Sequence, residues 1–513
     1  MKTPVIFSQE PDPPDQRCIG RRQVLSAMGA GALALLSAGC RGSSDAVTSL
    51  SETPTRAEPR GRPNFLFVLS DQHRHDWLGC AGTVPVRTPN LDALAAGGAR
   101  FTRVYCASPV CGPSRACLAS GLDYDRCGVP NHTVNYPIER PTYYGHLRDA
   151  GYHVMGCGKF DLHKATHNWG IDGQHLLREW GFSAGIDNAG KRDALSGTPQ
   201  HPRDPYLKYL SDRGLAEAHI ADFKSRQDYL STQPTPLDDE AYCDNWIGRQ
   251  ALRQLQDKPA GQPWHLVVNF AGPHEPMDVT AAMHEWYRRP PVSFPMPIDG
   301  DPRYAPEQLQ QVQSNYAAMV QNIDRWVGVF IQHLQERQEL ENTIVVYSSD
   351  HGEMLGDHRR WGKCVPYEAS VRVPLIVAGP GVQRGAVVDS LASHIDIGAT
   401  FLDYAAAKPL TDVDSRSLRP LLTGANDLNR SHVLSGLGPW RMVFDGRFKL
   451  AVGFHAGMTT SEIMRQRTIG SQTLLWDLQD DPAETHDLSA DQPAVVAQLT
   501  ALLPQQVAYG GLD

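Results

Sequence analysis

Polar side chains with the chemistry of metal ligands follow three apolar runs of the chain. Asp71 and Gln72 come just after the first run, and His274 comes after the second. Asp350 and His351 come after the third. Two carboxylates with an amide oxygen and an imidazole nitrogen suit a divalent cation, because hard oxygen donors dominate the set. Each of these residues alone is better explained as a turn or capping residue, but their shared position favours a metal site.

The runs indicate buried strands that would bring these residues together. They cover residues 64–69, 264–270, 343–347 and 374–378. Uninterrupted apolar runs of this length are typical of strands that are covered on both faces, as in a parallel sheet. Residues 312–334 carry an apolar residue every three or four positions, which predicts an amphipathic helix, and residues 88–98 predict another. This alternation predicts a doubly wound α/β fold, in which ligands bind beyond the carboxyl ends of the strands.

The length and composition are those of a globular protein with more than one domain. The chain has 513 residues, of which 41% are hydrophobic and 20% are charged. A prior of about 150 residues per domain predicts two to three domains. Lys and Arg total 48 against 57 Asp and Glu, and the net charge of −9 excludes a nucleic acid as partner. After Pro409, short strand-like pieces surround turns, which predicts a smaller C-terminal α+β subdomain over residues 409–513.

The first 40 residues have the features of an export signal. Arg21 and Arg22 precede a mildly apolar, uncharged stretch that runs to Cys40, as in twin-arginine signals. A membrane-spanning helix is the alternative, but the glycines of the stretch weaken a helix. Residues 36–40 also resemble a lipoprotein cleavage box, although the leucine lies one position too far from the cysteine. The alternative membrane attachment is therefore a lipid anchor at Cys40. With a linker over residues 41–62, the sequence predicts an exported protein, either periplasmic or associated with the cell envelope.

The chain has ten cysteines, and five of them fall between residues 80 and 127. No two are spaced as C-x-x-C, which argues against a zinc ribbon. Export would permit disulfides, but the sequence alone does not assign their pairing.

Residues 111–115 read CGPSR. This C-x-P-S-R pattern resembles the modification signal of the formylglycine-dependent (type I) sulfatases, a family of the alkaline phosphatase superfamily. Further segments on both sides of it resemble the family and occur in the family's order along the chain. They start at residues 63, 88, 120, 158, 273, 349, 361, 371, 475 and 481. The ordered set is far more specific than any one piece. The resemblance implies a large mixed, mostly parallel sheet sandwiched by helices, in a catalytic sulfatase domain over residues 63–408.

The resemblance also implies a metal centre. Its ligands would be Asp71, Gln72, Asp350 and His351, with residue 111 as a further ligand. Calcium is the usual metal of the family. Many relatives have Asp where Gln72 stands and Asn where His351 stands, so Mn²⁺ and Mg²⁺ remain alternatives.

The same resemblance assigns the catalytic groups. A formylglycine-generating enzyme would oxidise Cys111 to an aldehyde, and the hydrated aldehyde would be the nucleophile. Arg115 would anchor that side chain, Lys159 and Lys363 would bind sulfate oxygens, and His274 would lie near the leaving group.

One position departs from the family pattern. Relatives commonly have Gly-Lys-x-His, with a histidine that assists sulfate release. Here Asp161 stands at the place of that histidine, and His163 follows two residues later. Both are candidates for the base.

Three functions are compatible with the sequence. The first is an exported sulfatase that hydrolyses a small-molecule or carbohydrate sulfate monoester, or an aryl sulfate. The second is a phosphonate monoester or phosphodiester hydrolase on the same scaffold. The third is a binding protein without activity, in which Cys111 stays unconverted. Substrate specificity is expected in the loops of residues 169–244, which carry no motif.

Overall fold

The computed structural model describes residues 61–226, 229–425 and 430–504, all of which belong to one compact unit. The predicted export signal, the anchor site Cys40 and nearly all of the predicted linker lie outside these residues. No helix within the described ranges combines the length and the apolar character that a membrane crossing requires. The eight cysteines that fall within them are all free thiols.

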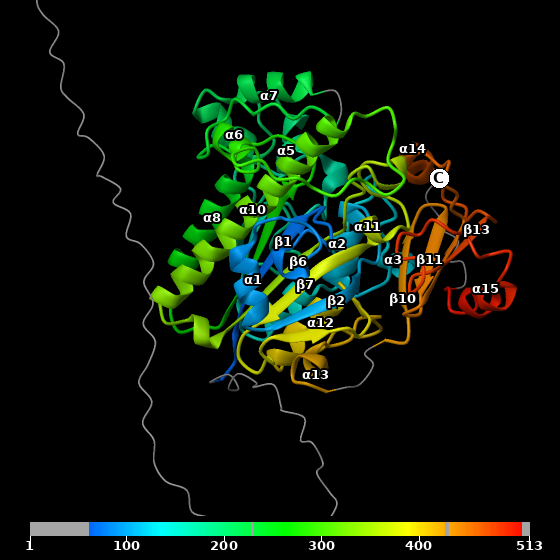
Figure 1. Cartoon of the computed structure of the whole chain (residues 1–513). Helices are drawn as coiled ribbons and strands as arrows, with labels where there is room; N and C mark the ends of the chain where they lie inside the picture. Colours follow the sequence, from blue (N-terminus) through cyan, green and yellow to red (C-terminus); the bar gives the residue numbers. More distant parts are fainter. Residues whose placement is uncertain (1–60, 227–228, 426–429, 505–513) are drawn as a thin grey trace, which may run out of the picture. The chain divides into compact units, whose positions relative to one another are not determined.

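A large mixed sheet lies at the centre of the unit (Figure 1). Its order is β4-β3-β5-β1-β6-β7-β2-β8, and β9 pairs with β2. The strands are β1 (Asn64–Asp71), β2 (Ala99–Tyr105), β3 (His153–Gly158), β4 (Ala184–Asp187), β5 (Trp264–Pro273), β6 (Thr343–Ser349), β7 (Arg372–Ala378), β8 (Ala386–Val388) and β9 (Ala392–Ser393). From β4 to β6 all neighbours are parallel, which confirms the mostly parallel sheet. β7 is antiparallel to both of its neighbours, although its apolar run looked like that of a parallel strand. Burial on both faces, and not strand direction, produces such a run.

Helices cover both faces of this sheet. Alternate residues of β1 point to opposite sides, so that Phe65 and Phe67 join one core and Leu66 and Val68 join the other. On the Leu66 side lie α1 (Pro89–Ala96), α8 (Cys243–Asp257) and α10 (Pro306–Glu336). On the Phe65 side lie α2 (Cys111–Ser120), α4 (Tyr143–Asp149) and α12 (Asp396–Tyr404). The helices predicted over residues 88–98 and 312–334 are confirmed as α1 and α10.

Shorter helices fill the connections between these elements. They are α3 (Tyr124–Cys127), α5 (Gly190–Asp193), α6 (Pro205–Asp212), α7 (Ala216–Ser225), α9 (Ala281–Glu285), α11 (Glu368–Val371) and α13 (Arg419–Leu422). Three of them, α5 to α7, lie in residues 169–244, where the sequence showed no motif. They form the upper part of the molecule in Figure 1.

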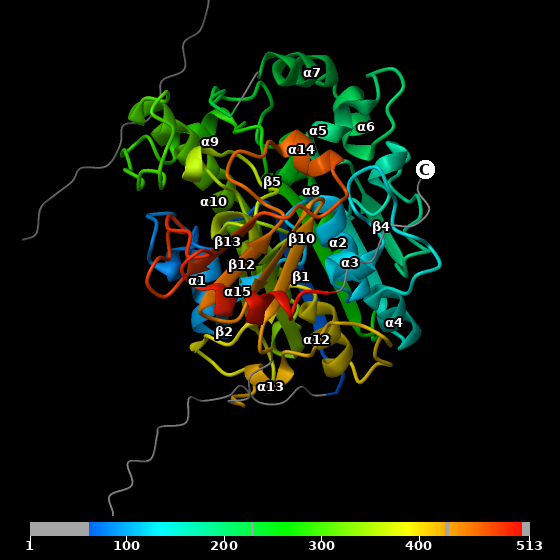
Figure 2. The ribbon, with the colours of Figure 1, turned by 90° about the vertical axis from the view of Figure 1, so that its right-hand side faces the viewer.

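A second, smaller sheet follows near the C-terminus (Figure 2). It is antiparallel, in the order β10 (Val433–Leu437), β11 (Trp440–Phe444), β12 (Phe448–Val452) and β13 (Thr473–Asp477). Trp440 and Met442 pack into the core that holds α2 and α12. The other face of the sheet packs against Leu499 of α15 (Pro493–Thr500), and α14 (Thr460–Arg465) precedes β13. The prediction of short strands after Pro409 is confirmed.

A buried ion pair joins this small sheet to α11, the short helix that leads into β7 of the large sheet. Lys449 of β12 is fully buried, and its Nζ lies 3.0 Å from Oε1 of Glu368 and also bonds Glu484. We expect Lys449→Met to lower the free energy of unfolding by about 3 to 5 kcal/mol, because it removes the buried cation of Glu484 and leaves Glu368 with Arg372 alone. Denaturant unfolding measures the loss. Arg447→Met removes a half-exposed partner of Asp477 and should change the stability little. Equal losses in the two variants would contradict the argument.

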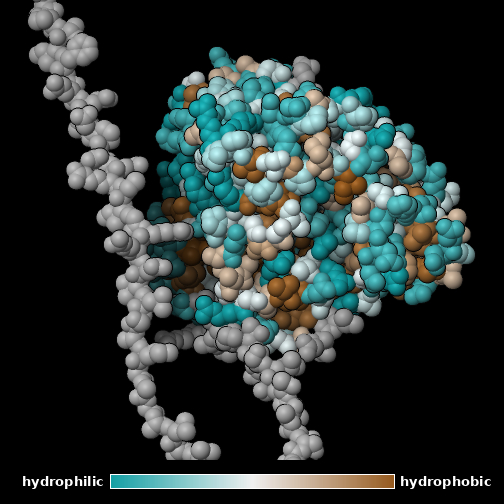
Figure 3. Space-filling model, viewed as in Figure 1, coloured by the Kyte–Doolittle hydropathy of each residue, from teal (hydrophilic) through white to brown (hydrophobic). Residues whose placement is uncertain are grey.

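The surface drawn in Figure 3 is mainly hydrophilic, and hydrophobic residues appear on it in small separate groups. Such scattered groups are normal on a folded protein.

Candidate active site

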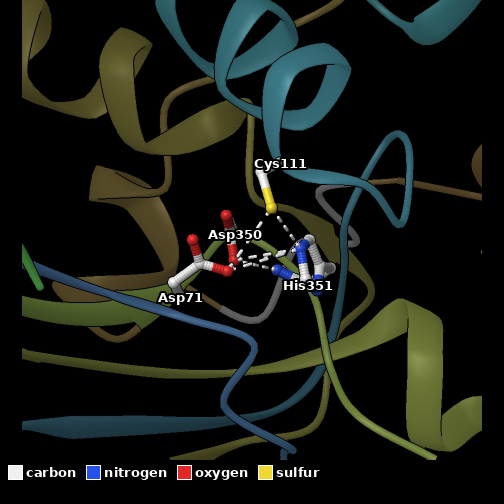
Figure 4. A group of neighbouring side chains, drawn as sticks. All are labelled: Asp71, Cys111, Asp350 and His351. Carbon is white, nitrogen blue, oxygen red and sulfur yellow. Dashed lines mark hydrogen bonds and ion pairs between the residues drawn. The ribbon is translucent and has the colours of Figure 1, made fainter. Parts of the chain in front are cut away.

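Two carboxylates and an imidazole meet at the carboxyl ends of two neighbouring strands. β1 ends at Asp71, and β6 runs parallel to it until just before Asp350, so that the two carboxylates leave the sheet side by side. Both are fully buried, as is the next residue, His351. Ligand atoms of these three residues and of Cys111 all lie within 4.8 Å of one another (Figure 4). The sheet thus brings together residues that are about 280 positions apart in the sequence.

The charges of this group fit a divalent cation. Burial raises the pKa of Asp350, and the neighbouring Asp71 carboxylate raises it further. Burial and the Cys111 thiol act to raise the pKa of Asp71 as well, but Lys159 leads a set of cations that hold it below its usual value. Two adjacent buried carboxylates repel each other, and a metal ion between them would remove that repulsion. Oxygen donors with one imidazole nitrogen suit Ca²⁺, Mn²⁺ or Mg²⁺.

Gln72 lies beside this group, but its side chain is bonded elsewhere. Its amide nitrogen donates to Glu275 Oε2 at 2.9 Å and to Glu353, and its Oε1 accepts a hydrogen bond from Lys363. Its backbone has a φ of 71°, and the backbone N–H donates to Asp350 Oδ1 at 3.0 Å. The main chain of Gln72 therefore orients Asp350, while Lys363 donates a hydrogen bond to the side-chain oxygen of Gln72.

Cys111 is the first residue of α2, and its thiol faces the carboxylates. Its Sγ lies 3.2 Å from Nε2 of His351, and 3.5 Å from both Oδ1 of Asp71 and Nζ of Lys363. Burial acts to raise the pKa of this thiol, but Lys159, Lys363 and His351 lower it well below its usual value. The residue is therefore held in an electropositive place that favours an anionic nucleophile.

Arg115 lies one helical turn after Cys111 and bridges both carboxylates. Its Nε donates to Asp350 Oδ2 at 2.9 Å, and its Nη2 lies 3.4 Å from Asp71 Oδ2. Nη1 donates to the backbone oxygen of Lys159 at 2.5 Å. The guanidinium thus fixes the helix start, the two strand ends and the segment after β3 relative to one another.

Lys159 and Asp161 follow β3 and are both buried. Nζ of Lys159 bonds Asp71 and lies 3.4 Å from Oδ2 of Asp161. Nζ of Lys164 lies 3.0 Å from the same Oδ2. Burial acts to raise the pKa of Asp161, but the two lysines hold it well below its usual value. Asp161 is therefore ionised, with one of its oxygens clamped between two ammonium groups.

His274 follows β5 and is paired with the next residue. Its Nδ1 lies 2.9 Å from Oε2 of Glu275. Burial lowers the pKa of the imidazole, but the Glu275 carboxylate outweighs burial and raises the pKa to about 9. The ring is therefore protonated at neutral pH and able to donate a proton.

His163 is not brought to this group. Its ring packs 5.7 Å from that of Trp169 and 5.2 Å from that of Trp180, measured between ring centroids. Its side chain is fully buried, with Nδ1 3.5 Å from Oδ2 of Asp187 and Nε2 3.2 Å from the backbone oxygen of Asn168. The sequence placed it near the site only because it lies four residues after Lys159.

A pocket of about 240 Å³ opens onto the site. It is strongly cationic, since its walls include His132, Lys159, Lys164, Ala189, Lys191, Arg192, Asp193, Ala271, His274, Glu275 and Lys363. None of the described residues that line it is Phe, Tyr or Trp. A larger pocket of about 460 Å³ lies against the C-terminal sheet and includes none of these residues.

Three residues of the site carried no signal in the sequence. They are His132, Glu275 and Glu353. Burial and Glu275 raise the pKa of Glu353 to about 7, and the Glu353 Oε1 accepts backbone hydrogen bonds from Leu355 and Gly362. Such loop residues belong to no periodic pattern, and only the folded chain places them.

Comparison with known proteins agrees with this geometry. The sequence profile of the family named Sulfatase matches residues 63–407, and a second profile, described as N-sulphoglucosamine sulphohydrolase, C-terminal, matches residues 356–508. The first covers well over half of the chain, so the chain belongs to the sulfatase family, whose members are sulfuric ester hydrolases.

Similar proteins include both sulfatases and a phosphonate hydrolase. An arylsulfatase of Clostridium perfringens is 26% identical over 396 residues, which are 72% of this chain and 81% of the relative. An N-acetylglucosamine-6-O-sulfatase of Bacteroides thetaiotaomicron is 26% identical over 407 residues, which are 72% of each protein. The solved phosphonate monoester hydrolase of Agrobacterium radiobacter superposes with a TM-score of 0.70 and 24% identity, over 88% of this chain and 98% of its own. That last likeness shows a shared fold.

Proposed function

We propose that this protein hydrolyses an organic sulfate monoester to an alcohol and sulfate, with residue 111 as the nucleophile after conversion to formylglycine. One observation carries the proposal. The side chain of Cys111 lies between a buried carboxylate–imidazole group and the ammonium of Lys363, and Lys363 lines a cationic pocket together with Lys159 and His274. A sulfate ester is an anion that resists nucleophiles, and this arrangement supplies both the nucleophile and the positive charge that lets it approach.

Asp71, Asp350 and His351 would hold the metal ion, most simply Ca²⁺. When bound, the ion would favour the ionised form of the hydroxyl at residue 111 and neutralise the sulfate. Lys159 and Lys363 would then bind the sulfate oxygens, and Arg115 would keep both carboxylates in place. His274, protonated through its pairing with Glu275, would give its proton to the departing alcohol oxygen.

The pocket favours a carbohydrate sulfate over an aryl sulfate. Its walls are charged, and Phe, Tyr and Trp are missing from the described residues that line it. Trp169, Trp180 and Trp246 are at most 3% exposed and pack in the core. The Bacteroides relative is named for a sulfated amino sugar, which supports the same substrate class.

Conversion of Cys111 would require a partner, a formylglycine-generating enzyme, before folding is complete. Residues 111–115 are all buried, so the folded chain does not present this segment to another enzyme. Twin-arginine export carries folded proteins, so conversion would precede export to the periplasm or the cell envelope. A lipid anchor at Cys40 remains part of the proposal.

The proposal is tested by two measurements on natively expressed protein. Peptide mass spectrometry across residue 111 should find the aldehyde, and sulfate release should be fastest with sulfated amino sugars and slower with a nitrophenyl sulfate. A phosphonate monoester and a phosphodiester, assayed in parallel, test the alternative class. Faster hydrolysis of either would select that class, and an intact thiol in an active enzyme would overturn the formylglycine route.

A further inference from the structure

His132 lies in the loop between α3 and α4, with its ring against the start of α2. Its Nε2 is buried and makes no hydrogen bond of regular geometry with the described residues, although the ring is close enough to the Cys111 thiol to interact with it. A ring nitrogen of His132, the Sγ of Cys111 and an oxygen of Asp161 all lie within 4.8 Å of one another. A buried imidazole nitrogen without a regular hydrogen bond is costly, which points to a group that it meets only during function.

The residue after Cys111 makes room for this ring. A Cβ at Gly112 would lie 3.2 Å from Cδ2 and 3.9 Å from Nε2 of His132, and the first of these contacts is tighter than an ordinary one. The Nε2 edge of the ring therefore faces the first turn of α2. The ring also lines the pocket together with Lys159 and His274, so it faces the space that a substrate would occupy.

The two residues that the sequence offered as the base do not fit that role. Asp161 already has Oδ2 shared by Lys159 and Lys164, and these cations oppose the uptake of a proton by its carboxylate. His163 is enclosed by Trp169 and Trp180 and does not line the pocket. A second interpretation of this cluster is a site in which Cys111, His132 and Asp161 bind a metal cation. The same two ammonium groups oppose it.

We propose that His132 is the catalytic residue that accepts the proton when sulfate leaves residue 111. This inference rests on the proposed function. The proton of the free hydroxyl moves to Nε2, and the electron pair of that O–H bond forms the carbonyl bond. The carbon–oxygen bond to sulfate breaks, and its electron pair leaves with the sulfate dianion. Water then adds to the carbonyl and restores the hydrate. An oxygen of Asp161 lies within 4.8 Å of a ring nitrogen and stabilises the imidazolium, while the ammonium of Lys164 opposes the charge.

The test uses His132→Ala and His132→Gln in the converted enzyme, the second to retain much of the ring's volume. We expect one equivalent of alcohol in a fast first turnover and a fall of roughly 10²- to 10⁴-fold in steady sulfate release. Acid-quenched enzyme should carry sulfate on residue 111 in peptide mass spectrometry. His146→Gln, on the surface of α4 and bonded to the backbone of Lys408, should leave all three readouts unchanged.

Two results separate failure of this inference from failure of the proposed function. Conversion of residue 111 and sulfate release by the unchanged enzyme are measured first, and their absence would reject the proposed function and this inference with it. Where both are present, equal loss of alcohol and sulfate release in the His132 variants, without sulfate on residue 111, overturns the inference alone. So does accumulation of the sulfated residue in Asp161→Asn but not in the His132 variants.

Discussion

Cys111→Ala is expected to abolish sulfate release and to leave the fold unchanged. The variant removes the thiol through which Cβ is oxidised to the aldehyde, and the loss of a nucleophile costs on the order of 10⁴- to 10⁶-fold in turnover. Lys159, Lys363 and His274 remain in place, so substrate should still bind. The measurements are sulfate release under substrate saturation, circular dichroism and the thermal midpoint.

The matched control lies in the same helix. Cys117 is equally buried in α2, but it takes no part in the group around Asp71, so Cys117→Ala should keep its turnover. Cys111→Ser adds a further check, because a serine hydroxyl that is not converted has no second hydroxyl with which to expel the sulfate. It should turn over once and stop. Normal turnover by Cys111→Ala would end the formylglycine hypothesis.

The strands that carry the metal group were predictable because they are buried on both faces. β1 and β6 are continuous apolar runs with polar residues at the ends, and the apolar run of β5 is interrupted only by His265 and Asn269. The stripe of α10 was equally clear, because its large apolar residues recur every three or four positions even where residues 312–320 are buried on every side.

β3 was not predictable, because packing dictates its composition. A Cβ at Gly156 would lie 2.4 Å from the ring of Phe160, and one at Gly158 would lie 1.9 Å from the backbone oxygen of Asn269. Both positions therefore require glycine, and glycine lowers the strand propensity that a sequence shows. Lys159 was found through the family resemblance alone.

The residues of the candidate site also divide into those that the sequence could predict and those that it could not. Asp71 and Asp350 could be found because each ends a recognisable strand. His132 and Glu353 lie in loops, and no spacing relates them to Cys111 until the chain is folded. His163 shows the converse, since proximity in sequence to Lys159 suggested a role that its burial between tryptophans does not support.

Asp350→Ala is expected to abolish metal retention and turnover together. Oδ1 of Asp350 accepts from the backbone N–H groups of Gln72 and His351, and Oδ2 accepts from Arg115, so the carboxylate orders both the metal ligands and the arginine. Without it one full negative charge of the donor set is lost. Metal content after dialysis against a chelator should fall from about one ion per chain to none.

Thermal stability is an independent measure of metal binding at the same site. A ligand at 100 times its Kd stabilises a protein by about 2.7 kcal/mol, so added Ca²⁺ should raise the Tm of the chelated wild-type protein and leave that of Asp350→Ala where it is. Asp324→Asn is the matched control, since Asp324 is also buried but bonds the start of α1 through Asn90 and Leu91. It should retain the ion. Unchanged metal content in Asp350→Ala would show that the cation is held elsewhere, and parallel titrations with Mn²⁺ and Mg²⁺ would then have to locate it.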